Sequence, residues 1–231
     1  MRESHTYLTK RLCDLSLATV AVLLSAPLCA VIAAVIKLED GGSVFYQQER
    51  VGKNGKQFRI WKFRSITGKS CRRRLLRNTE CRELPVTSTG RFLRATGMDE
   101  LPQLWNIIRG DMSFVGPRPL LPEEAEIDHP NRIVPLKNIP GYEARHGVRP
   151  GLTGLAQIFG SRHLPRRQKF RLDLLYIRKQ SILLDLQLIA VSLWIAAHGK
   201  CGESRNRRAG DVMHIHRPNH FAISANFRPI Y

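Results

Sequence analysis

The apolar and polar positions of this chain first mark out one long apolar run near the N-terminus. Residues 15–36 carry no charged side chain, and this length meets the ~20 residues that a helix needs to cross a bilayer. Pro27 lies mid-run, two residues after Ser25, and removes a backbone donor, so we expect the helix to break or kink there. The run is longer than that of a secretory signal, and a basic loop follows it instead of a small-residue cleavage site. The sequence therefore predicts a membrane segment at about 15–36.

Basic residues flank this segment on both sides: Arg2, Lys10, Arg11 and Lys37. Because Lys and Arg near membrane ends favour the cytoplasmic side, charge on both flanks favours a re-entrant helix that turns at 25–27 and leaves on the same face. We expect hydroxyls of Ser25 or Thr19 to bond the carbonyls freed at the break. A kinked helix that spans the bilayer once is the open alternative.

The pattern after the membrane segment changes between strand and helix signals. Residues 44–46 and 58–63 are predicted as short strands, and the Asn54-Gly55 pair between them is a strong hairpin signal. Apolar residues recur at helical spacing over 98–108, and we expect this helix to begin at Asp99 as the N-cap, with Pro102 in the first turn.

Residues 116–151 are proline-rich and loop-like, and 169–197 predict one or two helices. The apolar part of that region, 181–197, is short for a membrane crossing, so we expect a core or interfacial helix. The predicted fold is a helix-dominated α+β protein. It has a re-entrant membrane helix within 1–40, a compact cytosolic domain over 41–198 with interfacial helices and a small β element, and a basic tail over 199–231.

Charge narrows the choice of partner. The 231 residues contain 37 Lys and Arg against 19 Asp and Glu, a net charge of +18, and most of the excess lies between Arg50 and Arg94. Such a block suits nucleic acid, anionic lipid or the phosphates of a small substrate, or forms a solvated basic face. The five cysteines include no C-x-x-C pair, which fits neither a disulfide framework nor a zinc knuckle.

Adjacent Asp99 and Glu100 are the first candidates for chemistry. At the start of a helix, the dipole would keep a carboxylate ionised and the free N–H groups would face an anion. An ionised carboxylate can attack phosphorus to give an acyl phosphate, and Mg²⁺ would relieve its repulsion from a diphosphate. The structural alternative is that Asp99 only caps the helix and Glu100 only contacts solvent.

Two sets of residues complete the candidates. Arg118, held between Pro117 and Pro119, is suited to bidentate phosphate binding. Lys62 and Arg64 lie two apart on a predicted strand, so they share one face and could contact a phosphate. Neither a P-loop nor an Asp-x-Asp motif is present, since Phe63 stands where the first P-loop glycine would be.

Five blocks in order closely resemble the bacterial sugar transferase family, the monotopic polyprenyl-phosphate phosphoglycosyl transferases. The blocks lie at 10–15, 44–66, 89–122, 145–160 and 172–189, and the resemblance covers about residues 8–195. It implies transfer of a sugar 1-phosphate from a nucleotide sugar, usually a UDP-sugar, to undecaprenyl phosphate with release of UMP. Such enzymes begin exopolysaccharide, O-antigen and glycoprotein glycan assembly on the cytoplasmic face of the bacterial inner membrane.

The resemblance also implies roles for particular residues. Asp99 would be the nucleophile of a ping-pong reaction and Glu100 would help to hold Mg²⁺. Pro117, Arg118 and Pro119 would bind the donor, and Ser25 with Pro27 would form the break of the re-entrant helix. The further basic candidates for substrate binding are Lys62, Arg64 and Arg91. The expected partners are the UDP-sugar, undecaprenyl phosphate and membrane lipids, without nucleic acid, and a homo-oligomer is left open.

Some positions depart from the family pattern. Ser88 and Leu155 replace a frequent basic residue and a frequent Trp, and the 69–82 stretch is basic where relatives are commonly acidic, so the donor sugar is not predicted. Two other functions stay open: a non-catalytic, membrane-tethered basic protein that binds nucleic acid or anionic lipid, and an inactive partner of an assembly complex.

Overall fold

The computed structural model describes residues 2–66, 86–128, 132–160 and 164–198, so the predictions for 69–83 and for the 199–231 tail lie outside the described residues.

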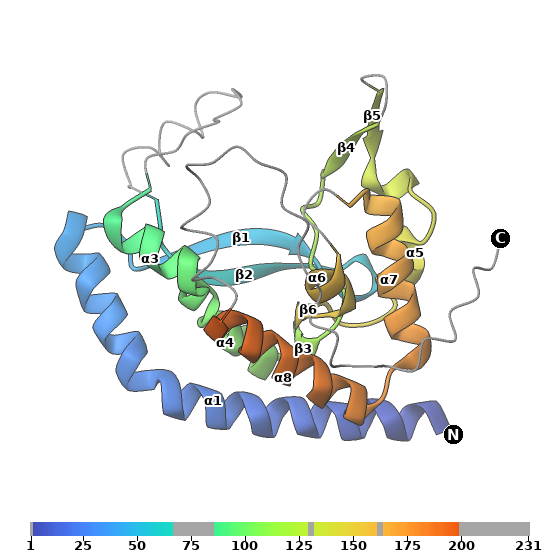
Figure 1. Cartoon of the computed structure of the whole chain (residues 1–231), viewed down its shortest axis with the longest axis horizontal. Helices are drawn as coiled ribbons and strands as arrows, with labels where there is room; N and C mark the ends of the chain where they lie inside the picture. Colours follow the sequence, from blue (N-terminus) through green and yellow to red (C-terminus); the bar gives the residue numbers. More distant parts are fainter. Residues whose placement is uncertain (1, 67–85, 129–131, 161–163, 199–231) are drawn as a thin grey trace.

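The first helix dominates the architecture. Helix α1 (Arg2–Asp40) runs through Pro27 without interruption, and Figure 1 shows that it bends along its length. By length and composition, the stretch Leu8–Asp40 is long and apolar enough to cross a membrane.

The hydroxyl groups around Pro27 do not act as expected. In a helix, Pro27 leaves the carbonyl of Leu23 without its donor. Ser25 Oγ instead donates to Ala21 O at 2.7 Å, and Thr19 Oγ1 donates to Leu15 O, also one turn back along the helix. The expectation that they serve the freed carbonyl was wrong, because each short side chain reaches only the carbonyls of its own preceding turn. Such bonds themselves favour helix bending.

The predicted hairpin is confirmed. Strands β1 (Phe45–Val51) and β2 (Gln57–Phe63) pair antiparallel, and the turn between them contains the short 3₁₀ helix η1 (Lys53–Gly55). Asn54 and Gly55 both have positive φ angles, 55° and 76°. These left-handed conformations are the ones for which an Asn-Gly pair is favoured.

The helix expected over 98–108 begins later than predicted. Helix α3 (Ser88–Thr96) ends at Gly97, a 3₁₀ turn η2 (Met98–Glu100) follows, and α4 (Gln103–Arg109) begins after Pro102. Asp99 therefore lies in η2 and does not cap α4. Pro102 has no N–H to donate, and the bonds around it span three residues, from Leu104 N to Leu101 O and from Trp105 N to Pro102 O.

The proline-rich region contains several short elements. Strand β3 (Ser113–Val115) pairs in parallel with β6 (Gly151–Thr153), and β4 (Ala125–Asp128) pairs antiparallel with β5 (Arg132–Pro135). The turn η3 (Leu136–Asn138) and the helices α5 (Tyr142–Arg145) and α6 (Leu155–Phe159) lie between and after these strands. The prediction of an irregular loop there was incomplete because strands of three or four residues carry little periodicity.

The late helical prediction is confirmed as two helices, α7 (Arg166–Lys179) and α8 (Ile182–His198). In Figure 1 the start of α8 lies next to α1, and there Lys10 Nζ of α1 lies 2.5 Å from Asp185 Oδ2 of α8. The fold over the described residues is thus helix-dominated α+β, with three two-stranded sheets.

Helix α1 belongs to the core as well as to the surface. Its Ala18 packs with Ile107 and neighbouring residues, and its Ile32 and Ile36 pack with Phe63 and Leu93. Most of its other apolar side chains are exposed. Exposure of a large apolar surface is typical of a membrane or partner contact.

Polar contacts also fasten α1 to the rest of the chain. Arg11 donates to the carbonyls of Ile107 and Ile108 at 2.6 and 2.8 Å, satisfying groups at the end of α4. Asp14 is buried and accepts a bond from Phe114 N. These bonds fix α1 against α4 and β3.

Candidate active site

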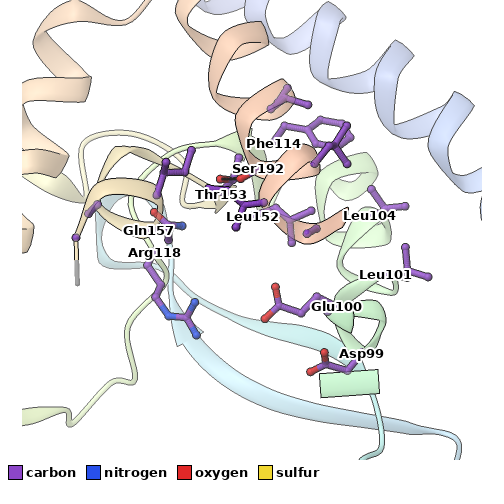
Figure 2. Close-up of a pocket in the computed structure, with 18 of the residues that line it drawn as sticks. Asp99, Glu100, Leu101, Leu104, Phe114, Arg118, Leu152, Thr153, Gln157 and Ser192 are labelled. Carbon is purple, nitrogen blue, oxygen red and sulfur yellow. Dashed lines mark hydrogen bonds between the residues drawn. The ribbon is translucent and has the colours of Figure 1, made fainter. Parts of the chain in front are cut away.

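A cavity of about 1050 Å³ collects residues from most of the fold. Its walls come from α1, η2, α4, the loop that carries Arg118, and helices α6, α7 and α8. Figure 2 shows the carboxylates of Asp99 and Glu100 on one side and the guanidinium of Arg118 facing them from the other. The structure therefore brings together three of the residues singled out in the sequence.

Asp99 is held in a partly dehydrated place. Burial raises the pKa of its carboxyl above the usual aspartate value and neighbouring Glu100 adds to that shift, while the cations of Lys62 and Arg94 oppose it. The sequence-based argument relied on a helix dipole to keep Asp99 ionised, but Asp99 precedes α4 and lies in a 3₁₀ turn. The charge of this carboxylate depends on side-chain cations instead. A carboxylate with less hydration is also a more available nucleophile.

Glu100 and Lys62 form an ion pair at the dyad. Lys62 Nζ lies 2.6 Å from Glu100 Oε1, and Lys62 reaches it from strand β2, which packs beside η2. The strand thus delivers a cation next to both carboxylates. Lys62 lies beside the dyad without lining the cavity, and its expected role in binding substrate stays a prediction.

The loop at Arg118 is fixed through its main chain. Pro117 and Pro119 are buried while Arg118 is exposed. The carbonyls of Pro117, Arg118 and Pro119 accept bonds from Gly151 N at 2.9 Å, Arg145 Nη2 at 2.7 Å and Arg50 Nη1 at 3.1 Å. Three separate segments therefore hold this loop, and the Arg118 side chain projects from a rigid support.

Arg145 is the centre of that support and was not predicted from the sequence. Its guanidinium is buried, with Nε 2.9 Å from Asp173 Oδ2 and its Cζ 4.7 Å from the centre of the Phe170 ring. Burial and Arg145 lower the pKa of His146 to about 4, so this imidazole is neutral near pH 7. Its Nδ1 faces Tyr142 O at 2.6 Å, which leaves Nε2 to accept from Arg145 Nη1 at 3.3 Å.

One sequence signal could have revealed the buried Asp173 but not its partner Arg145. Phe170, Asp173 and Tyr176 are buried on α7 at a spacing of three residues. An acidic residue in line with two aromatic core residues requires a buried partner. Arg145 stood in the motif of residues 145–160, but nothing in the sequence joined it to Asp173.

Further basic groups line the cavity. Arg94, counted from the sequence only as part of the basic block, lines it and donates to Ser65 Oγ at 2.8 Å. Arg166 and Lys169 of α7 also line it, and Arg166 pairs with Glu124. Burial and the charge of Arg166 lower the pKa of Lys169. This part of the cavity suits a strongly anionic ligand.

Other predicted residues lie elsewhere. Arg64 is buried and pairs with Asp40 at the end of α1. Arg91 is exposed on α3, with Nη2 3.4 Å from Ser88 Oγ. Neither lines the cavity, and the same holds for Ser25 and Pro27.

The predicted Mg²⁺ can be compared with the metal ligands that the described residues offer. The part of the chain that the structure describes holds no group of three or more His, Cys, Asp and Glu side chains arranged for a metal ion. Asp99 and Glu100 supply two carboxylates. Because Mg²⁺ is commonly held by one or two carboxylates together with substrate phosphates, these residues fit that ion without a protein cage.

Comparison with known proteins places this chain in a family. The family model for bacterial sugar transferases matches residues 5–199. This chain belongs to the bacterial sugar transferase family. The resemblance inferred from the five sequence blocks is thereby confirmed.

Two relatives that are named for their reaction share its class and differ in the sugar. The chain is 40% identical to a Klebsiella pneumoniae UDP-glucose:undecaprenyl-phosphate glucose-1-phosphate transferase, over 80% of this chain and 39% of the relative. It is 36% identical to the exopolysaccharide production protein ExoY of Rhizobium meliloti, over 79% and 82%. It is 37% identical to an Aeromonas hydrophila UDP-N-acetylgalactosamine-undecaprenyl-phosphate N-acetylgalactosaminephosphotransferase, over 78% and 41%. The chain thus spans about two fifths of the length of two of these family members.

Proposed function

We propose that this chain transfers a sugar 1-phosphate from a UDP-sugar to undecaprenyl phosphate. The reactions for which the Klebsiella and Aeromonas relatives are named support this reaction class. The observation that carries the proposal is the placement of Asp99 and Glu100 opposite Arg118 in one cavity that α1 also lines. That arrangement offers a nucleophile, cations for phosphate and access to a lipid.

The reaction would proceed in two displacements at one phosphorus. Asp99 Oδ attacks the sugar-bearing phosphorus of the donor, a phosphosugar–aspartyl bond forms, and the bond from that phosphorus to the bridging oxygen breaks. UMP leaves with the electron pair of that bond. A phosphate oxygen of undecaprenyl phosphate then attacks the same phosphorus, and the Asp99 carboxylate is released with its charge restored.

Charged residues in and beside the cavity would position and neutralise the phosphates. Arg118 and Arg94 would bind phosphate oxygens, since guanidinium groups match them in pairs of hydrogen bonds. Lys62 would keep Asp99 ionised despite its burial. Glu100 would hold Mg²⁺, which when bound supplies positive charge to the diphosphate and its leaving group.

The proposed location is the bacterial inner membrane. The chain 41–198 would lie on the cytoplasmic face, where nucleotide sugars are available. Helix α1 would enter the bilayer and leave on the same face, because its bend and its two basic flanks favour that path. The exposed apolar side chains of α1 support contact with lipid.

A radiolabelled transfer assay tests the proposal. Membranes containing the full chain are incubated with undecaprenyl phosphate, Mg²⁺ and a panel of UDP-sugars, and UMP release and lipid product are measured. We expect Asp99→Asn to abolish turnover and Glu100→Gln to raise the Mg²⁺ concentration required. Glu49→Gln is the matched control, since Glu49 is exposed on β1 outside the cavity.

Mass spectrometry distinguishes the two-step route from direct transfer. Protein treated with donor alone should carry one phosphosugar on Asp99. Turnover by Asp99→Asn at the wild-type rate, or an adduct found only on another residue, would overturn the nucleophile assignment. Binding of anionic lipid or nucleic acid that collapses with salt, with no transfer to any acceptor, would favour the non-catalytic alternative.

A further inference from the structure

Arg50 of β1 is a half-buried cation next to the loop that carries Arg118. Tyr46, four residues earlier on β1, lies opposite Lys62 of β2. Because side chains at every second position of a strand share a face, Arg50 and Lys62 lie on the same side of the hairpin. Lys62 pairs there with Glu100, so this side of the hairpin extends from the dyad to the Arg118 loop.

The guanidinium of Arg50 is bonded to neutral oxygens. Its Nη1 donates to Pro119 O at 3.1 Å, and its Nη2 donates to Gln48 Oε1 at 2.6 Å. Its Nε is buried and has no hydrogen-bond partner. Arg50 thus holds the residue after Arg118 with a charge that neither oxygen neutralises.

The cations of Arg50 and Arg118 act on each other. Burial lowers the pKa of the Arg50 guanidinium, and the cation of Arg118 lowers it further. Arg118 is exposed and lines the cavity, whereas Arg50 lies beside its loop outside the cavity lining. Repulsion between the two cations favours an Arg118 side chain that points away from Arg50, and an anion in the cavity is attracted by both charges.

The carboxylates near Arg50 are paired with other cations. Glu124 and Glu100 counteract the lowered pKa of Arg50, but Glu124 pairs with Arg166 and Glu100 pairs with Lys62. Within the described residues, no ion pair includes Arg50. Because a charge that is withdrawn from water without a counterion is costly, this arrangement suits a cation whose counterion arrives with a ligand.

We infer that Arg50 is a positioning residue for phosphate binding: it holds the Arg118 loop and adds a positive charge whose counterion is the phosphate of the nucleotide. The inference rests on the proposed function, since this phosphate would leave with UMP. Arg118 would contact the phosphate, and Arg50 would act through Pro119 and through its charge. Negative charge grows on this phosphate as its bond to the sugar-bearing phosphorus breaks, so a second cation would stabilise the leaving group.

The first test measures the binding of UMP and of uridine to the full chain in nanodiscs by calorimetry. UMP carries about two negative charges near pH 7 and uridine carries none. Arg50→Gln should weaken UMP binding roughly tenfold and leave uridine binding unchanged. Arg50→Lys should recover part of the lost affinity, because it keeps the charge and loses the planar fork.

Arg59→Gln is the matched control for the loss of a cation. Arg59 lies on the other side of the same hairpin and is exposed, and its Nε is 3.9 Å from Glu49 Oε1. An exposed pair of this kind contributes little to stability. UMP binding by Arg59→Gln should therefore equal that of the wild type.

The second test gives Arg50 a counterion within the protein. Gln48→Glu places a carboxylate where Gln48 Oε1 accepts from Arg50, so the loop stays held while the charge of Arg50 is neutralised. UMP binding should weaken about as much as in Arg50→Gln, and Tm should not fall. Gln47→Glu adds the same charge to the opposite, exposed face of β1 and should leave UMP binding unchanged.

Three results would overturn the inference: wild-type UMP affinity in Arg50→Gln, an equal loss of UMP and uridine affinity in that variant, or wild-type UMP affinity in Gln48→Glu. The last would show that Arg50 only holds the loop. Because UMP binding needs no turnover, the two proposals can fail separately. UMP affinity that depends on Arg50 without any phosphosugar transfer would support the inference and refute the proposed reaction. Transfer with UMP affinity that is independent of Arg50 would do the opposite.

Discussion

The buried pair of Arg145 and Asp173 permits a prediction that separates stability from function. Both side chains are almost fully buried, 2% and 4% exposed. Removing one partner leaves a buried charge unpaired, which costs about 3–5 kcal/mol. For a domain of this size each kcal/mol shifts Tm by about 2–4 °C, so Arg145→Met or Asp173→Leu alone should lower Tm by roughly 6–20 °C.

The double variant Arg145→Met/Asp173→Leu should behave differently. Burial raises the pKa of Asp173 even though the adjacent Arg145 cation lowers it, so the cost of dehydrating the charge outweighs the attraction. Replacing both charges with apolar side chains removes that cost, and most of the lost Tm should return. The carbonyl of Arg118 loses the hydrogen bond from Arg145 in Arg145→Met and in the double variant alike. The KM for the UDP-sugar should therefore be raised in both, even though the double variant regains Tm.

The assay combines two readouts on the full chain in nanodiscs: thermal unfolding followed by intrinsic fluorescence, and steady-state transfer kinetics. Two outcomes would refute the reasoning. If the double variant is as unstable as the single ones, the pair stabilises the fold by its own attraction. If it binds donor as the wild type does, Arg145 has no part in positioning Arg118.

Three further predictions concern the dyad and α1. Lys62→Met removes a cation that lowers the pKa of Asp99. When kcat/KM is measured between pH 5 and 9, its acid limb should therefore move to higher pH. An acid limb at the wild-type pH would contradict the role given to Lys62. Because the pKa of Asp99 is raised on folding, its ionisation opposes folding as pH rises through that value, so Asp99→Asn should have a higher Tm than the wild type near pH 7 and lose this advantage in acid. Pro27→Ala restores the N–H donor that the carbonyl of Leu23 lacks and should straighten α1. A cysteine introduced by Ser43→Cys should then be labelled by a thiol reagent added on the periplasmic side. Labelling that stays cytoplasmic would show that the bend does not set the topology.

Local signals explain what the sequence predicted well. Asn54-Gly55 indicated the hairpin because Asn and Gly tolerate the positive φ angles that the turn requires. The apolar spacing of 169–197 predicted helical structure, since packing follows the helical period. Asp99, Glu100 and Arg118 were singled out because their residue types carry the chemistry; the structure places them in one cavity, and their roles stay predictions.

The sequence-based predictions were wrong or incomplete at positions whose conformation or partner is set by other parts of the structure. Lys62 and Arg64 were expected on one face of a strand, but β2 ends at Phe63, so the alternation of sides no longer applies to Arg64. The start of the helix near Asp99 depended on Pro102, which favoured a 3₁₀ turn over an earlier N-cap. Arg145 and Asp173 are 28 residues apart, and no local pattern pairs them.

The ion pair between Lys10 and Asp185 has a consequence for biosynthesis. These residues lie 175 positions apart, which at ~5–20 residues per second separates their synthesis by about 9–35 s. Throughout that interval, a nascent chain already has α1 but lacks α8 and hence one side of its cavity. Chains truncated before Ile182 would therefore contain Asp99 yet lack the α8 side of the cavity. The order of translation delays the first turnover until α8 has joined α1.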